Sequence, residues 1–120
     1  MFEEMNLSAL IHKGVSGDPT AVPAIEALKM GTMYGAKALG LSHVGSLSVG
    51  NKADFIALQL QQAHFTPRTD EVSHVVYSAG AQDVEHVWVD GIQLVRHKQC
   101  LTVDEEKVRY EAQKALERIS

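Results

Sequence analysis

The sequence has a single cysteine, Cys100, among its 120 residues. One thiol cannot form an intramolecular disulfide framework, and a lone thiol is typical of a reducing compartment, so we expect a cytoplasmic protein. Basic residues are also few, because 11 lysines and arginines stand against 15 acidic residues, for a formal net charge of −4. A general electrostatic interaction with nucleic acid needs the opposite balance, so we expect no nucleic-acid partner.

Long apolar runs are missing as well. No stretch approaches 18 consecutive apolar residues, so the sequence predicts neither a transmembrane helix nor a membrane partner. The first ten residues carry two glutamates and no basic cluster, so no signal peptide is expected. The composition, 45% hydrophobic and 22% charged, is that of an ordinary globular domain. A compact domain of this length buries about two-thirds of its unfolded surface.

The spacing of apolar residues predicts helices in the first third of the chain. Residues 1–13 form the first expected helix, with Gly14 as its stop. Residues 24–39 form the second, in which Gly31 and Gly35 indicate a kink or close packing against another element. The inward-facing residues of the second helix are expected to be Ile25, Leu28 and Ala36.

The period changes from helical to alternating after residue 41. Residues 54–60 predict a strand, residues 72–78 fit either a short helix or a strand, and residues 84–95 predict a hairpin around an Asp-Gly turn. A capping box made by Thr102 and Glu105 predicts a final amphipathic helix that starts at Val103.

These elements predict an α+β fold. We divide it into N-terminal helices in residues 1–42, a small β-sheet or half-sandwich in residues 43–101, and a C-terminal amphipathic helix in residues 102–120. The three parts are expected to form one compact unit.

Six histidines raise the question of a metal site, and their spacing answers it. The sequence has no H-x-H, no H-E-x-x-H and no C-x-x-C pattern. The only pair worth considering as metal ligands is His64 and His74, which lie in or beside a long polar loop. Cys100 is expected to be a free structural thiol, and no residue is predicted to be catalytic.

The glycines and the aspartate around residue 50 have ordinary structural interpretations. Gly45 and Gly50 match no phosphate-binding pattern and are expected to be the turns of a β-hairpin. Asp54 lies just before an apolar strand. A carboxylate in this place more often accepts hydrogen bonds from a neighbouring turn than takes part in catalysis.

Several stretches together resemble the amidohydrolase superfamily. Residues 45–56, GSLSVGNKADFI, resemble the G-S-L-x-x-G-x-x-A-D-hydrophobic segment near the end of many such enzymes, and residues 84–91, VEHVWVDG, resemble the V-x-x-V-x-V-x-G that follows it. The structural motif residues are Gly45, Gly50, Ala53, Asp54, Asp90 and Gly91. The ordered set of motifs is most similar to 5-methylthioadenosine/S-adenosylhomocysteine deaminases and related chlorohydrolases. This set also includes the segments MFEEM, GVSGDPT, GAKALG, and HFTP followed by SHVVY.

The resemblance implies a fold and a cofactor. In that family zinc or another divalent metal lies in a (β/α)₈ barrel and activates a water molecule, and its ligand motifs lie upstream of the segment that this chain resembles. The resemblance therefore implies no metal ligand and no cofactor in this chain. It implies that residues 1–42 are the last barrel helices, that residues 43–101 are sandwich strands, and that the final helix packs back on them.

The leading hypothesis is a C-terminal fragment or stand-alone remnant of a metal-dependent amidohydrolase, without catalysis of its own. The alternatives are an oligomerising structural module, a subunit that completes a separately encoded barrel, and a small metal-binding protein that uses His64 and His74. Without the N-terminal strands of the sandwich, residues 54–60 or 84–95 should have an unpaired edge. An open edge favours a homo-oligomer by strand addition or swapping.

Overall fold

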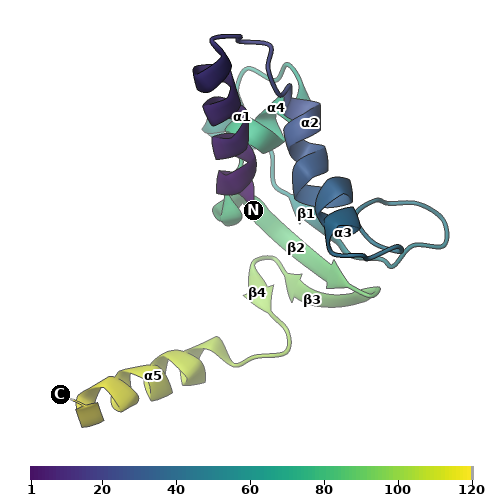
Figure 1. Ribbon diagram of the computed structural model, residues 1–120. Coiled ribbons are helices and arrows are strands. Elements are labelled where there is room, and N and C mark those ends of the chain that lie inside the picture. Colours follow the sequence, from purple (N-terminus) through teal and green to yellow (C-terminus); the bar gives the residue numbers. More distant parts are fainter. Residues whose placement is uncertain (120) are drawn as a thin grey trace.

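The computed structural model describes residues 1–119 as a group of short helices, a four-stranded antiparallel sheet and a projecting C-terminal helix (Figure 1). The prediction of an α+β fold is confirmed at this level. The elements are α1 (Phe2–Ser16), α2 (Ala24–Lys29), the π-helical turn η1 (Met30–Tyr34), α3 (Gly35–Ala38), β1 (Phe55–Leu58), the 3₁₀ turn η2 (Ala63–Phe65), α4 (Glu71–Tyr77), the 3₁₀ turn η3 (Ala81–Asp83), β2 (Val84–Val89), β3 (Ile92–Arg96), β4 (Gln99–Cys100) and α5 (Glu105–Ile119).

Helix α1 is longer than the sequence predicts. The prediction that Gly14 stops it was wrong, because the helix continues to Ser16 and ends at Gly17, which has a left-handed φ of 66°. Lys13 accounts for the extra turn. Its ammonium group lies in the last turn of α1 and donates hydrogen bonds of 2.8 Å to the carbonyl oxygens of Ala21 and Val22, which tie the following loop to the helix.

The second expected helix is confirmed as α2, η1 and α3, which follow one another without a break. The close packing expected at Gly31 is also present, since a Cβ there would lie 2.7 Å from the sulfur of Met5. The prediction that Ile25 faces inward was wrong, because its side chain is 45% exposed. The inward positions of Ala36, which is buried, and Leu28, which packs against the core, are confirmed. The helix also buries Ala27.

The ambiguous segment at residues 72–78 is the helix α4. Asp70 is its N-cap residue, and its carboxylate accepts a 2.9 Å hydrogen bond from the backbone N–H of Ser73. This bond satisfies one of the free donors at the helix start and favours the helix over the strand.

The sheet has the order β1-β2-β3-β4, with every neighbouring pair antiparallel. The expected hairpin is confirmed as β2 and β3. Its turn residues Asp90 and Gly91 have φ values of 51° and 78°, the left-handed pair of a type I′ turn. Among the described residues β1 pairs with β2 only, so the predicted strand forms an edge of the sheet.

The segment between α3 and β1 is an irregular loop, and the prediction of a β-hairpin at Gly45 and Gly50 was wrong. Both glycines do have positive φ, 89° and 91°. The loop is closed by other bonds: the Asn51 amide donates to the Ser46 hydroxyl at 2.9 Å, and the Lys52 N–H donates to the His43 carbonyl at 2.8 Å. A side-chain bond and a single backbone bond take the place of a strand ladder.

The hydrophobic core is small and lies between α1, α2 and α4, which gather at one end of β2 (Figure 1). Its buried centre is Ala9, Ala27 and Val76. The accessible surface is 8723 Å², whereas a compact protein of this mass exposes about 6,400 Å². The radius of gyration is 17.8 Å, against about 14 Å for a compact chain of this length. Both values are larger than those of a compact chain of this size, and the division into one compact unit stays a prediction.

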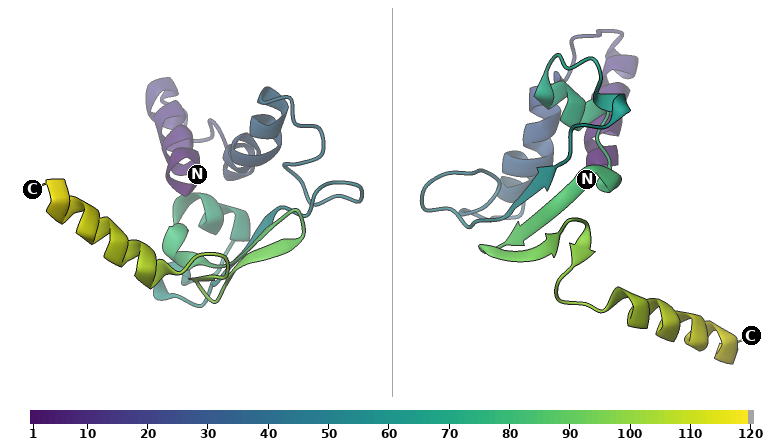
Figure 2. Two further views of the ribbon diagram at one scale, coloured as in Figure 1. Left: turned by 90° about the horizontal axis from the view of Figure 1, so that it is seen from below. Right: turned by 180° about the vertical axis from the view of Figure 1, so that it is seen from behind.

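Helix α5 begins at Glu105, two residues later than predicted. Its first turn is capped by Asp104, whose carboxylate accepts a 3.0 Å hydrogen bond from the Lys107 N–H, and not by Thr102. Both views in Figure 2 show α5 extending away from the rest of the molecule, and all of its residues are exposed. In this chain it does not pack back on the sheet as expected. Within residues 1–119 no helix combines the length and apolar character needed to cross a membrane.

Candidate functional site

The motif around Asp54 forms a junction between the loop that enters β1 and the turn between β2 and β3. The Asp54 carboxylate accepts a 2.6 Å hydrogen bond from the backbone N–H of Asp90, and the Gly91 N–H donates to the Ala53 carbonyl at 3.0 Å. Lys52 adds an exposed ion pair with the Asp90 carboxylate at 3.3 Å, which contributes little energy in water. The role of Asp54 in this geometry is to hold a turn.

Gly45 places the same loop against the helices. A Cβ at this position would lie 2.9 Å from the Ala36 side chain and 3.0 Å from the Thr32 carbonyl oxygen, and φ is 89°. Both the close approach and the positive φ require glycine here. The motif residues Gly45 and Asp54 therefore join the helical part of the chain to the sheet.

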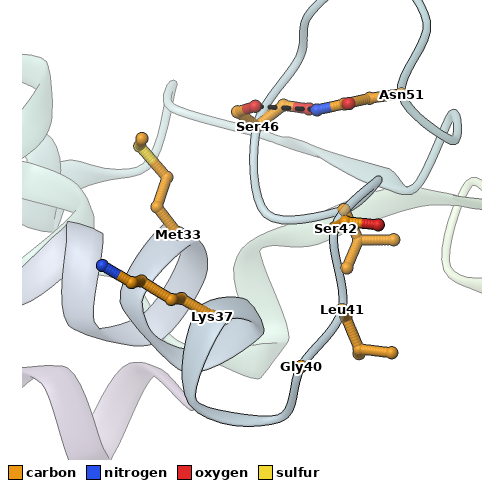
Figure 3. A pocket seen from close by; sticks show the side chains of 8 residues that line it. Met33, Lys37, Gly40, Leu41, Ser42, Ser46 and Asn51 are labelled. Atoms are coloured by element: carbon orange, nitrogen blue, oxygen red, sulfur yellow. Dashed lines mark hydrogen bonds between the residues drawn. The ribbon is translucent and has the colours of Figure 1, made fainter.

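A pocket lies between the end of the second helix and this loop, with a volume of about 470 Å³. Figure 3 shows Met33 and Lys37 on the helical side and the hydrogen-bonded pair Ser46 and Asn51 on the loop side. The residues that line it are Met33, Lys37, Gly40, Leu41, Ser42, Val44, Ser46 and Asn51. Since this lining contains no carboxylate, imidazole or thiol, the pocket holds no group for metal binding and no carboxylate–imidazole pair for acid–base chemistry.

His64 and His74, the pair considered as metal ligands, lie around the buried ring of Phe65. The ring centroids are 4.2 Å apart for His64 and Phe65 and 5.8 Å apart for His74 and Phe65. Each imidazole also has a hydrogen-bond partner. His64 Nε2 lies 3.1 Å from the carboxylate of Asp83, and His74 Nε2 accepts a 3.4 Å bond from the Thr69 N–H.

Asp83 is a buried carboxylate that the sequence analysis did not single out. It is 2% exposed, and besides His64 it accepts a 2.9 Å hydrogen bond from the Gly80 N–H. These bonds attach the polar loop before α4 to the turn that leads into β2. The signal in the sequence is the spacing of Gly80 and Asp83, which is typical of a side chain that caps a short turn.

A second cluster that sequence reasoning missed comprises Glu85, His86 and His97. One ligand atom from each side chain lies within 4.8 Å of the other two. Among residues 1–119, no other three histidine, cysteine or acidic side chains come together in this way. Eleven residues separate the two histidines in the sequence, so a motif search does not connect them. A regular hairpin with the predicted two-residue turn would place residue 85 opposite residue 96. The register shift between Val87 and Trp88 moves the pairing by one residue, which no local sequence pattern reveals.

Cys100, at the end of the sheet, has a lowered thiol pKa. The causes are hydrogen bonds from the side chain and then the backbone N–H of Thr102. The thiol is partly buried and free.

The protein family follows from a comparison of the whole sequence. The model of the amidohydrolase family matches residues 1–94. The chain belongs to the amidohydrolase family. The predicted resemblance is therefore confirmed, and the motifs around Asp54 and Gly91 lie within the matched segment.

Named relatives in this amidohydrolase family include deaminases of modified adenosines. The chain is 48% identical to the 5-methylthioadenosine/S-adenosylhomocysteine deaminase of Acetivibrio thermocellus over 99% of its length and 28% of the relative's length. It is also 48% identical to the 5′-deoxyadenosine deaminase of Methanosarcina barkeri over 99% of this chain and 27% of that protein. The chain thus spans little more than a quarter of these relatives.

Solved amidohydrolase structures contain the same arrangement of elements. A zinc-bound adenosine deaminase from Xanthomonas campestris superimposes with a TM-score of 0.92 at 31% identity, over 99% of this chain and 27% of that one. A zinc-containing atrazine chlorohydrolase from Arthrobacter aurescens has a TM-score of 0.83 over 95% of this chain and 26% of its own, and at 24% identity it shows the shared fold only.

Proposed function

We propose that this chain is the C-terminal portion of a metal-dependent amidohydrolase that deaminates a purine nucleoside. In this reaction water replaces the exocyclic amino group of the ring and ammonia leaves. The observation that carries the proposal is the identity of 48% over 99% of the chain to a deaminase of 5-methylthioadenosine and S-adenosylhomocysteine. A 5′-modified adenosine is therefore the substrate class that we assign to the complete enzyme.

The excess surface of the chain supports a role as part of a larger fold. The accessible area exceeds that of a compact protein of the same mass by about 2,300 Å². Exposed large apolar side chains contribute to it on α1, α2 and η1, for example Leu7, Ile11, Ile25 and Met33, and also on α5. An area of this size is comparable with an obligate interface, so we assign the exposed apolar side chains of α1, α2 and η1 to contacts with the rest of a (β/α)₈ barrel.

The family zinc is not assigned to residues of this chain. A bound zinc ion would supply a Lewis acid that activates the attacking water. The two histidines considered from the sequence already have partners, because His64 is paired with the buried Asp83 and His74 accepts a backbone N–H. We propose that the catalytic ligands come from polypeptide outside these 120 residues and that the chain is inactive by itself.

The contribution of this chain would be to position other parts of the enzyme. The Asp54 and Gly45 junctions hold the helices and the sheet together, so helices that belong to the barrel are attached to strands that belong to the sandwich. The free edge of β1 is the place where we expect a further strand to pair, either from the remaining polypeptide or from a second copy. The cytoplasmic location expected from the single cysteine stays a prediction.

The inactivity of the chain by itself can be tested with purified protein. The chain is incubated with zinc and either 5′-methylthioadenosine or S-adenosylhomocysteine, and ammonia release is measured. We expect no release above a protein-free control. Steady turnover that scales with protein concentration and is abolished by a chelator would contradict the proposal.

A further inference from the structure

We propose that Glu85, His86 and His97 form a binding site for a divalent transition-metal ion of the zinc type on the small sheet. Their three ligand atoms already lie within 4.8 Å of one another. Nothing in the proposed deaminase reaction requires this ion, so the two proposals can be tested separately.

A β-bulge explains how two neighbouring residues reach the same site. In a regular strand the side chains of Glu85 and His86 point to opposite faces. Here Ala57 pairs with His86 and Leu58 pairs with Val84, so Glu85 is an extra residue in β2. A bulge of this kind redirects the side chains beside it, and bulges are common next to functional sites.

The turn between β3 and β4 supplies the third ligand. His97 and Lys98 have φ values of 46° and 65°, which make a tight left-handed turn, and the Lys98 N–H donates to the Glu85 carbonyl at 2.9 Å. The His97 backbone N–H donates to His86 Nδ1 at 3.2 Å, and His97 Nδ1 lies 3.0 Å from the Glu85 carboxylate. Backbone bonds thus hold the turn against the bulge before any ion arrives.

The donor set determines which ion would bind. Two imidazoles and one carboxylate suit zinc and the later divalent transition metals, whereas magnesium and calcium prefer oxygen ligands only. Zinc–nitrogen bonds of about 2.0–2.1 Å place tetrahedral ligand atoms about 3.3 Å apart. The side chains would therefore close in by about 1.5 Å or less, which rotation about their χ angles can supply.

The site is accessible from solvent. The His97 side chain is 71% exposed and the Glu85 side chain is 30% exposed, so an ion can enter, and water can fill the remaining coordination position. The His97–Glu85 contact is the bond that the ion would replace.

The test uses the full chain without a polyhistidine tag, stripped of metal with a chelator. Zinc chloride is titrated by calorimetry, and the histidine ring signals are followed by NMR. We expect one zinc per chain with a micromolar dissociation constant, with the largest ring shifts at His86 and His97. Magnesium at the same concentration should give no binding heat.

Two variants and one control decide the assignment. His97→Asn keeps a residue that tolerates positive φ, and His86→Gln removes the second imidazole; each should weaken zinc binding at least tenfold. His43→Asn removes an exposed histidine outside the cluster and should leave the affinity unchanged. Affinities within twofold of the unaltered chain in both variants, or ring shifts centred on other histidines, would overturn the proposal. Should His86→Gln fail to fold by circular dichroism, His97→Asn and the NMR shifts still give the answer.

Discussion

Individual aspartate carboxylates stabilise turns and helix starts by accepting hydrogen bonds from backbone N–H groups. Asp54 accepts the Asp90 N–H, Asp70 caps α4, and Asp104 caps α5. In each case a short polar side chain satisfies a backbone donor that has no partner in the secondary structure. These residues therefore control where elements begin and how they join.

The junction at Asp54 leads to a stability prediction. Asp54→Ala removes the acceptor of the 2.6 Å bond from Asp90 and should lower the free energy of unfolding by about 1 kcal/mol. Asp54→Asn keeps an acceptor oxygen and should lose less. Urea denaturation followed by circular dichroism measures both. Equal midpoints for the alanine variant and the unaltered chain would show that the junction does not stabilise the fold.

The cap at Asp70 leads to a prediction about pH. Hydrogen bonds from the side chain and the backbone N–H of Ser73 lower the pKa of the Asp70 carboxyl below its usual 3.8. Because the folded state holds the proton less tightly than the unfolded state, the contribution of Asp70 is fully present above about pH 4 and is lost as the pH falls through the lowered pKa. Asp70→Ala should reduce the melting temperature at pH 7 by a few degrees.

The control for this prediction is Asp70→Asn, which retains a good N-cap without a titrating group. The difference in melting temperature between the unaltered chain and Asp70→Asn should be constant from pH 7 to pH 5 and should change only below about pH 4. A change centred near pH 6 would mean that another group is responsible.

At the scale of elements, local sequence signals predicted strands and turns well where a single interaction decides the conformation. The Asp90-Gly91 turn fits only a tight hairpin, and β2 and β3 formed as expected. Boundaries failed where two candidates competed. Helix α1 ends at Gly17 and not at Gly14, because Lys13 ties the following loop to the last turn of the helix. Helix α5 is capped by Asp104 and not by Thr102. The loop at Gly45 does not form the predicted hairpin, because it packs against a helix. No local sequence pattern reveals this contact.

The open edge of β1 leads to a prediction about association. Among residues 1–119 β1 pairs on one side only, and its Ile56 is 47% exposed. Unpaired strand edges with apolar residues promote pairing between chains, and a lysine on such an edge opposes it. We expect the chain to dimerise as its concentration rises, and Ile56→Lys to raise the dissociation constant at least tenfold.

A matched control is Ile92→Lys, which introduces the same charge at a 65% exposed position on β3, an inner strand of the sheet. It should leave dimerisation nearly unchanged. Sedimentation velocity over a hundredfold range of concentration distinguishes the cases. A chain that stays monomeric throughout, or two variants with the same effect, would contradict pairing through the β1 edge.

At the scale of the whole molecule, the sequence indicated the family but not the shape. The motifs around Gly45, Asp54 and Gly91 are local, so they could be recognised without a structure, and the family match over residues 1–94 confirmed them. The extended form could not be predicted, because composition alone does not tell whether apolar side chains face the chain's own core. The cluster of Glu85, His86 and His97 was missed for the same reason, since it depends on a bulge and a turn that bring distant residues together.

The central claim is that this chain is a working C-terminal portion of a purine-nucleoside deaminase, and a chimaeric enzyme tests it most directly. The aligned segment of the Acetivibrio thermocellus deaminase, to which the chain is 48% identical, is replaced by this chain. The same enzyme without that segment serves as the control, and ammonia release from 5′-methylthioadenosine is measured. The account predicts that the chimaera releases ammonia within about tenfold of the rate of the unaltered deaminase and that the truncated control releases none. A chimaera that is folded and loaded with zinc but inactive would contradict it.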